Sequence, residues 1–290
     1  LTGGYRRTLD FFELTKPRVT LMVLVTTVVG FYLGSHSVPD YLRLVQTLLG
    51  TALAAGGTLA LNQFLERDAD AAMERTRRRP LPEGRVQPTE ALIFGVALTL
   101  LGLVILWTAV NTLSALVTAA ITASYLFAYT PLKQKSSLCS VVGAVPGALP
   151  PVIGWAAARG QLDLGAWVLF AIMFLWQIPH TLAIARLYRE DFARAGIRFL
   201  PVVEPDGRST GRQILITCLA LLAVSLLPTM LHVAGYLYFV AAFLLGALFL
   251  GCGVGLTVSC SASAARRLVL ASLIYLPLLL AAMALDRIPL

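Results

Sequence analysis

Residues 42–80 of the chain read LRLVQTLLGTALAAGGTLALNQFLERDADAAMERTRRRP. The first part of this stretch can cross a membrane as a helix, because about 20 mostly apolar residues suffice. If the helix continues past Asn62, then Asn62, Glu66 and Asp70 recur every four residues and share one face. The stretch therefore predicts a membrane helix that ends in a polar stripe and is followed by a cluster of arginines.

Eight further segments have the same length and apolar character. The chain has 290 residues, 58% of them hydrophobic and 13% charged, which is more apolar surface than a soluble domain of this size can bury. Helices are expected because lipid offers no partner to free backbone groups, and the alternating pattern of a membrane β-barrel is missing. We therefore predict one all-α polytopic membrane domain over residues 1–290, with nine transmembrane helices at 19–35, 42–62, 89–110, 113–129, 138–157, 165–185, 213–232, 235–257 and 267–285.

The basic residues predict how these helices are oriented, since cytoplasmic loops carry an excess of Lys and Arg. With the N-terminus in the cytoplasm and the C-terminus outside it, 20 of the 23 basic residues lie on the cytoplasmic side. The net charge of +8 then reflects topology and anion binding, and gives no reason to expect nucleic-acid binding. The long charged loops 63–88 and 186–212 share the cytoplasmic side, and we expect them to be catalytic because loops longer than packing requires are usually functional.

Glu66 and Asp70 are the leading candidates for metal ligands. Neighbouring carboxylates are costly to hold together without a cation, and Mg²⁺ binds through one or two carboxylates plus the oxygens of a substrate phosphate. Asn62 is placed to hold a metal-bound water or a phosphate oxygen. The alternative is a solvated helix end with salt bridges within the helix. The basic candidates for stabilising a leaving diphosphate are Arg75, Arg79 and Lys133.

The second long loop supplies further candidates. His180 lies within a predicted span near its cytoplasmic end, directly after Pro179, and both a structural hydrogen bond and a ligand or acid–base role remain open. Asp191 is the carboxylate of this loop best suited to the metal. No Asp, Glu, Lys or Arg lies in the middle of a predicted span, which disfavours an ion-coupled transporter and favours chemistry on an amphiphilic substrate at the membrane surface.

These motifs resemble the UbiA superfamily of intramembrane prenyltransferases, and more closely its haem-farnesylating branch. The acidic stripe alone is typical of the superfamily, whereas its Met73-x-Arg75-Thr76 extension and the Trp176-x-x-Pro179-His180 element point to the haem branch. The other matching elements, which together span residues 15–201, are Thr15-Lys16-Pro17-Arg18, Tyr129-Thr130-Pro131-Leu132-Lys133, Pro150-Pro151-x-x-Gly154-Trp155, Arg189-Glu190-Asp191-Phe192 and Ala195-Gly196-Ile197-x-x-Leu200-Pro201.

The resemblance implies a UbiA-type bundle of nine helices around a central cavity that opens sideways to lipid. It implies Mg²⁺-dependent transfer of farnesyl from farnesyl diphosphate to a vinyl group of haem b (protohaem IX), giving haem O and diphosphate. The metal would be held by Asn62, Glu66, Asp70 and Asp191. For the haem, the hypotheses are that His180 ligates the iron or orients the macrocycle, and that Arg194 and Arg198 meet the propionates.

The implied partners are farnesyl diphosphate, haem b, membrane lipid and, downstream, a haem A-forming enzyme or terminal-oxidase assembly. The chain length, with no transit extension, favours a bacterial plasma (inner) membrane over a mitochondrial inner membrane. Three departures from the family pattern stand out: the second loop lacks a paired Asp-x-x-x-Asp motif, Cys139 stands where an Asn is usual, and Arg198-Phe199 replaces Pro-Met. Two alternatives stay open, a prenyltransferase for an aromatic quinone precursor and a non-catalytic haem or lipid carrier.

Overall fold

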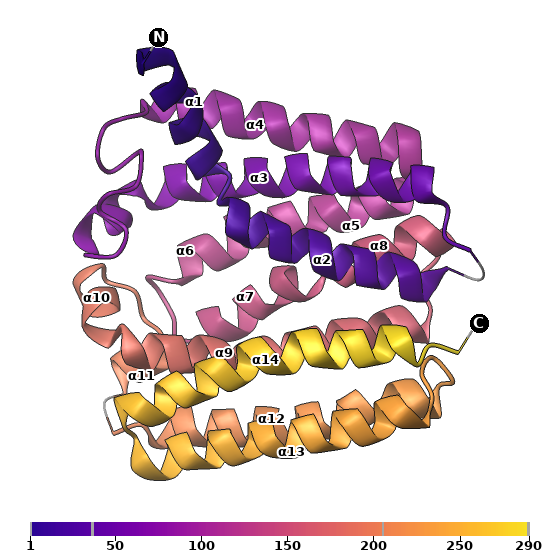
Figure 1. Cartoon of the computed structure of the whole chain (residues 1–290). Helices are drawn as coiled ribbons and strands as arrows, with labels where there is room; N and C mark the ends of the chain where they lie inside the picture. The colour runs from indigo at the N-terminus through magenta and orange to yellow at the C-terminus, as the bar shows by residue number, and fades with distance from the viewer. Residues whose placement is uncertain (1, 36–37, 205, 289–290) are drawn as a thin grey trace.

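The computed structural model describes residues 2–35, 38–204 and 206–288, which form a helical bundle (Figure 1). Among the described residues, nine helical spans are long and apolar enough to cross a membrane, so the predicted fold class is confirmed. These spans are Pro17–Gly34, Tyr41–Ala72, Pro88–Val110, Thr112–Leu132, Cys139–Arg159, Leu164–Leu187, Arg208–Met230, Tyr236–Ser259 and Ala262–Leu285.

The individual elements subdivide some of these spans. In chain order they are α1 (Thr2–Leu14), α2 (Pro17–Gly34), α3 (Tyr41–Ala72), α4 (Pro88–Ile105), a π-helical turn η1 (Leu106–Val110), α5 (Thr112–Ala123), a second π-helical turn η2 (Ser124–Tyr129), α6 (Thr130–Leu132), α7 (Cys139–Ala148), α8 (Pro150–Arg159), α9 (Leu164–Leu187), α10 (Arg189–Arg194), α11 (Leu200–Val203), α12 (Arg208–Met230), α13 (Tyr236–Ser259) and α14 (Ala262–Leu285).

Short polar side chains begin several of the long helices. Asp40 accepts a hydrogen bond from Arg43 N at 3.0 Å at the start of α3, and Asp163 accepts one from Gly165 N at 3.1 Å at the start of α9. Such N-caps satisfy backbone donors that have no partner within the helix. Helix α8 ends at Gly160, whose positive φ of 72° suits a glycine C-cap.

Prolines break the fifth span and shape its interior. Helix α7 stops at Ala148 and α8 starts at Pro150, because a proline lacks the backbone donor that would continue the helix. The fifth span is therefore interrupted between Ala148 and Pro150. In the fourth span, Pro131 removes another donor just after the π-helical turn η2, a wider turn of the kind often found at functional sites.

Helices α2 and α8 pack backbone against backbone. A Cβ on Gly30 would lie 1.9 Å from Pro151 O, and one on Gly154 would lie 2.0 Å from Thr27 O, so only glycine permits this approach. Gly251 and Gly255 of α13 have no such packing role among the described residues. Added Cβ atoms at these two positions would meet no described atom within 4 Å, because these faces point away from the neighbouring helices.

The two long charged loops lie at the same end of the bundle, on the left of Figure 1, together with α1, α10 and α11. The C-terminal end of α14 lies at the opposite end. Helix α9 runs through the centre of the main core, where Trp155, Tyr238 and Tyr275 are fully or almost fully buried. That the loop end faces the cytoplasm, with residues 63–88 and 186–212 exposed there, stays a prediction from the charge asymmetry. Position 205 of the second loop is outside the described residues.

Candidate active site

A polar cavity of about 280 Å³ opens at the loop end of the bundle. Its walls come from the ends of α3, η2 and α9, and from the two long loops. Seven of the eight residues predicted to be catalytic line this one cavity: Asn62, Glu66, Asp70, Arg75, Arg79, Lys133 and His180. The eighth, Asp191, lies in a neighbouring pocket.

Two ion pairs hold the carboxylates of the predicted stripe. Lys133 Nζ lies 2.7 Å from Glu66 Oε1, and Arg79 Nη1 lies 2.7 Å from Asp70 Oδ2. The Asp70 side chain is only 2% exposed and that of Glu66 15% exposed, and neither pairs with a residue of its own helix. These carboxylates are therefore not a solvated helix end with intrahelical salt bridges.

Lys133 contacts both a carboxylate and an aromatic ring. Its Nζ also lies 4.4 Å from the centre of the Tyr129 ring, a cation–π distance. Burial alone would lower the pKa of Lys133, but Tyr129, Glu66 and Tyr125 together raise the pKa above the usual lysine value. The surroundings of Lys133 therefore favour its charged form next to the carboxylate of Glu66.

Asn62, on α3, links the start of α2 to the fourth span. Its Oδ1 accepts a hydrogen bond from Lys16 Nζ at 3.1 Å, and its Nδ2 donates to Thr130 Oγ1 at 3.1 Å. Lys16 thus reaches into the cavity from the start of α2. Burial, together with the nearby charges of Arg79 and Lys133, lowers the pKa of Lys16 to about 7.

Arg75 forms part of the wall between the two loops. Its guanidinium lies 5.7 Å from the Tyr188 ring centre and 5.1 Å from the Phe192 ring centre, on residues of the second loop. Burial and the neighbouring Arg79 lower the pKa of Arg75, while Asp70 and Asp191 oppose that shift. An arginine remains charged even so, because its usual pKa lies far above neutral pH.

Asp191 connects the loops but does not join the Glu66–Asp70 group. Its Oδ1 accepts a hydrogen bond from the backbone N of Glu74 at 3.4 Å and forms an ion pair with Arg194. Partial burial raises the pKa of Asp191, but the bonds from Arg194 and from the backbone of Glu74 and Arg75 outweigh it and lower the pKa overall. Asp191 and Arg194 line a second polar pocket of about 870 Å³.

Arg198, the other arginine considered for haem contacts, has an exposed side chain. Its backbone N donates to Lys133 O at 2.7 Å, which ties the second loop to the end of the fourth span. The next residue, Phe199, lines the polar cavity and packs against Phe192 with ring centres 5.0 Å apart. The Arg198-Phe199 pair, which replaces Pro-Met of the family pattern, thus places the aromatic ring of Phe199 in the cavity wall.

His180 is both hydrogen-bonded and part of the cavity. Its Nδ1 lies 2.6 Å from Ser272 Oγ, and its ring stacks on Trp176 with centres 5.1 Å apart. Trp176 itself donates from Nε1 to the backbone O of Ser272 at 2.9 Å. The imidazole is therefore held in a fixed orientation by α14, with Nε2 as the nitrogen that remains for a ligand.

An apolar cavity of about 140 Å³ adjoins the polar one at Tyr125, which lines both. Its walls come from α2, α3, α5, η2, α7 and α8, and include Val19, Thr58, Pro146 and Pro150. The proline-broken fifth span therefore borders this apolar space. The combined site is polar at the loop end and apolar toward the interior of the bundle.

Apolar packing and one arginine hold the first loop in place. Met73 shares a small buried cluster with Phe192, Ile197 and Phe199 of the second loop, which joins the two loops below their charged residues. Further along, Leu81 and Val86 pack in another cluster with Leu14, at the end of α1.

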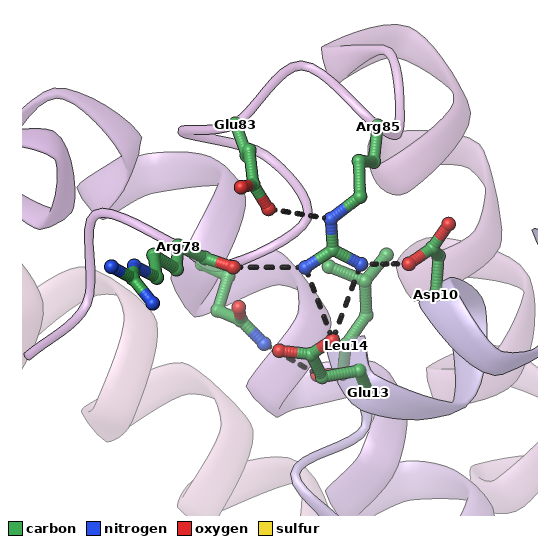
Figure 2. A network of polar contacts seen from close by, with 7 residues as sticks. Asp10, Glu13, Leu14, Arg78, Glu83 and Arg85 are labelled. Atoms are coloured by element: carbon green, nitrogen blue, oxygen red, sulfur yellow. Dashed lines mark hydrogen bonds and ion pairs between the residues drawn. The ribbon is translucent and has the colours of Figure 1, made fainter.

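Arg85 fastens the loop to α1, as Figure 2 shows. Its guanidinium donates to Glu83 Oε2 at 2.8 Å, to the backbone O of Arg78 at 2.8 Å and to Glu13 Oε2 at 3.3 Å, and it forms an ion pair with Asp10. Because Arg79 follows Arg78 directly, this network fixes the segment that carries an active-site cation.

Several residues of the polar cavity were not predicted from the sequence, among them Lys16, Tyr125 and Phe199. Lys16 was counted only among the basic residues that set topology, and Tyr125 was treated as part of a membrane span. Phe199 was noted only as a departure from a pattern. The one available signal was the position of Lys16 within the Thr15–Arg18 motif, immediately before the first span.

Comparison with known proteins identifies the family to which this chain belongs. The chain matches the UbiA prenyltransferase family over residues 23–283. It is 51% identical over 287 residues to the protoheme IX farnesyltransferase of Solibacter usitatus, covering 96% of this chain and 98% of that protein. It is 45% identical over 281 residues to that of Myxococcus xanthus, covering 97% of this chain and 95% of that protein.

Solved structures share the fold at low sequence identity. A digeranylgeranylglyceryl phosphate synthase superposes with a TM-score of 0.83 at 17% identity, covering 98% of this chain and 100% of that one. A UbiA homolog from Archaeoglobus fulgidus bound to GPP and Mg²⁺ superposes with a TM-score of 0.63 at 18% identity, covering 94% of this chain and 99% of that one. By sequence and by fold, this chain belongs to the UbiA prenyltransferase family.

Proposed function

We propose that this chain transfers the farnesyl group of farnesyl diphosphate to a vinyl group of protohaem IX, forming haem O. The observation that carries this proposal is a cavity rich in cations and carboxylates beside an apolar cavity, with Tyr125 lining both. This division suits a donor with a charged head and a hydrocarbon tail. The acceptor is inferred from the protoheme IX farnesyltransferases that the chain resembles over nearly its whole length.

The donor set of the polar cavity fits Mg²⁺. Glu66 and Asp70 supply carboxylate oxygens one helical turn apart. Asn62, one turn earlier, has its amide oxygen engaged by Lys16 Nζ, so it would contribute by holding a metal-bound water. The described residues include no cluster of three or more His, Cys, Asp or Glu side chains arranged to hold a metal. A Mg²⁺ ion that takes its remaining ligands from water and substrate phosphate needs no such cluster. When bound, it would neutralise part of the diphosphate charge.

The cations of the cavity then act on the donor. Carboxylates that hold a metal ion attract Lys133 and Arg79 less strongly, so these two side chains become available to the phosphate oxygens. Arg75 adds a third charge beside them. Fixed cations stabilise a leaving diphosphate best where water is excluded, because they are already oriented when its charge grows. Asp191 remains the second loop's candidate for supporting the metal, acting from its neighbouring pocket.

The reaction balances with water as a third reactant. The bond between farnesyl C1 and the diphosphate oxygen breaks, and its electron pair leaves with the diphosphate. The terminal vinyl carbon of the haem bonds to C1, water adds to the neighbouring carbon, and one proton is released. Before the vinyl group attacks, C1 has allylic cation character, and the apolar cavity beside Tyr125 keeps water from capturing it early.

His180 is the best candidate for contact with the acceptor. Ser272 engages Nδ1, so Nε2 is the nitrogen available to ligate haem iron or to orient the macrocycle. An unchanged absorption spectrum and an unchanged haem affinity in His180→Ala would contradict this role. Arg194 and Arg198 are proposed to meet the propionates, and equal haem affinity after both are neutralised would remove that assignment.

The chain is an integral, multi-pass membrane protein. We place it in a bacterial plasma membrane, in keeping with its bacterial relatives, with its product passing to a haem A-forming enzyme or to terminal-oxidase assembly. The pairing of its two loops at one end of the bundle supports a single catalytic face.

The test uses the purified full chain in lipid nanodiscs with haem b, farnesyl diphosphate and Mg²⁺. We expect haem O, identified by chromatography and mass, together with one diphosphate released per product. Chelation of the metal should stop both. An aromatic quinone precursor offered in place of haem serves as the competing acceptor. A folded preparation that makes no haem O, or that prefers the aromatic acceptor, contradicts the proposal.

A further inference from the structure

Lys16 differs from the other cations of the polar cavity in what it touches. Lys133 and Arg79 each lie 2.7 Å from a carboxylate oxygen. Lys16 has no carboxylate within ion-pair distance among the described residues, and its Nζ donates to the neutral amide oxygen of Asn62 at 3.1 Å. A lysine directed into a cavity with only a neutral acceptor retains hydrogen-bonding capacity for an anionic ligand, and the negative charge of that ligand favours the protonated form of the lysine.

The backbone places Lys16 at this point despite a conformational cost. Lys16 has φ 46° and ψ 66°, in the left-handed region that residues with a Cβ rarely adopt. Its side chain makes no capping hydrogen bond to the start of α2, so capping does not explain the strain. Strained residues that persist are frequently found at functional sites. Here the strained residue is the one whose ammonium points into the cavity.

The Lys16–Asn62 hydrogen bond lies where the two cavities meet. Asn62 lines the polar cavity, while Thr58, one turn earlier on α3, lines the apolar one. Likewise Lys16 lines the polar cavity, while Val19, three residues later, lines the apolar one. A donor with its diphosphate in the first cavity and its hydrocarbon in the second has its C1–O bond at this junction.

We propose that Lys16 is a catalytic residue whose ammonium hydrogen-bonds the oxygen that joins farnesyl C1 to the diphosphate. As the C1–O bond breaks, its electron pair moves onto this oxygen, and Lys16 stabilises the charge that develops there without giving up its proton. Asn62 holds the ammonium in place, since Thr130 fixes the other side of the amide. This inference rests on the proposed prenyl transfer.

The test compares Lys16→Met with Arg18→Met in the full chain in nanodiscs. Arg18 lies two residues away, has an exposed side chain and does not line either cavity. Three quantities are measured: kcat at saturating farnesyl diphosphate and haem b, the Kd of farnesyl thiodiphosphate by calorimetry, and the melting temperature. Wild-type production of haem O tests the function itself, so a failure of the function is distinguishable from a failure of the Lys16 assignment.

We expect Lys16→Met to lower kcat by about 10²–10³-fold, as the loss of one donor to a developing oxyanion does. The Kd of the thio analogue should rise by less than roughly tenfold, because the contact strengthens as the bond breaks. Arg18→Met should match the wild type. If Lys16→Met shows no cooperative melting, Lys16→Gln, which keeps a donor for Asn62 without the charge, replaces it.

Two outcomes overturn the proposal. A kcat of a folded Lys16 variant within about threefold of the wild type would show that the ammonium does not act on the breaking bond. An increase in the KM for haem with kcat unchanged would show that Lys16 serves a propionate of the acceptor.

Discussion

The ion pair between Lys133 and Glu66 allows the stability of the site to be separated from its chemistry. Three variants are needed: Glu66→Gln, Lys133→Met and the double variant that carries both changes. The first leaves a buried lysine without its carboxylate, the second leaves a carboxylate without its lysine, and the third replaces the pair with neutral side chains. Only the first and second should destabilise the fold.

The magnitude follows from the geometry of the pair. The two charged atoms are 2.7 Å apart, and the side chains are 12% and 15% exposed, so solvent screens them little. Breaking a buried pair by removing one partner costs about 3–5 kcal/mol. Lys133 keeps its contact with the Tyr129 ring at 4.4 Å, so Glu66→Gln should fall at the lower end, about 3 kcal/mol. That corresponds to a melting temperature roughly 5–10 °C lower.

The assay is thermal melting in nanodiscs combined with haem O formation. The double variant should melt within roughly 3 °C of the wild type, because neutral replacement of a buried pair is often without cost. Its activity should nevertheless be at least about 100-fold lower, since Glu66 is assigned to the metal and its loss leaves the diphosphate unneutralised. Recovery of activity in the double variant would refute the metal assignment. A single variant as stable as the wild type would refute the electrostatic reasoning.

Three further predictions concern residues around this pair. Arg79→Gln should weaken binding of inorganic diphosphate by roughly 10–100-fold, measured by calorimetry. Arg77→Gln, at an exposed position, should leave this affinity unchanged, because Arg77 does not line the cavity. Gly30→Val should abolish the folded protein seen in detergent chromatography, since its Cβ would lie 1.9 Å from a carbonyl oxygen of α8. Gly251→Val should leave the folded yield unchanged, because a Cβ there meets no atom of a neighbouring helix within 4 Å. Arg85→Ala should make backbone amides of α1 exchange hydrogen roughly tenfold faster, because the network in Figure 2 loses its central donor, and exchange at the wild-type rate would show that apolar packing alone holds α1.

The spans were predictable because the membrane imposes one strong rule on sequence. An apolar run of the required length must be helical, so hydropathy located all nine spans. The polar stripe was predictable for a similar reason, since Asn62, Glu66 and Asp70 share a face whenever the helix continues, and α3 continues to Ala72. Both inferences depend only on residues that are near one another in the chain.

What could not be predicted depends on contacts between distant segments. The partner of Glu66 is Lys133, just after the fourth span, and no spacing in the sequence indicates that pair. Asp191 was grouped with Glu66 and Asp70 as the best-suited carboxylate of the second loop and because the family resemblance implied it, yet it bonds Glu74 and Arg194 beside a second pocket. Lys16 was hidden because a basic residue before a first span is expected for topology alone. Only tertiary packing shows which cations face the cavity.

The balance of charge in the polar cavity argues that its ligand is an anion. Lys16, Arg75, Arg79 and Lys133 bring four basic side chains against the two carboxylates of Glu66 and Asp70. Lys133 and Arg79 each face one carboxylate, so the remaining positive charge of Lys16 and Arg75 favours a multiply charged anion in the cavity. A carrier of neutral lipid would gain nothing from this excess of positive charge. A diphosphate whose tail enters the adjoining apolar cavity satisfies both halves of the site, and its departure during catalysis would return Lys133 and Arg79 to the carboxylates with which they pair here.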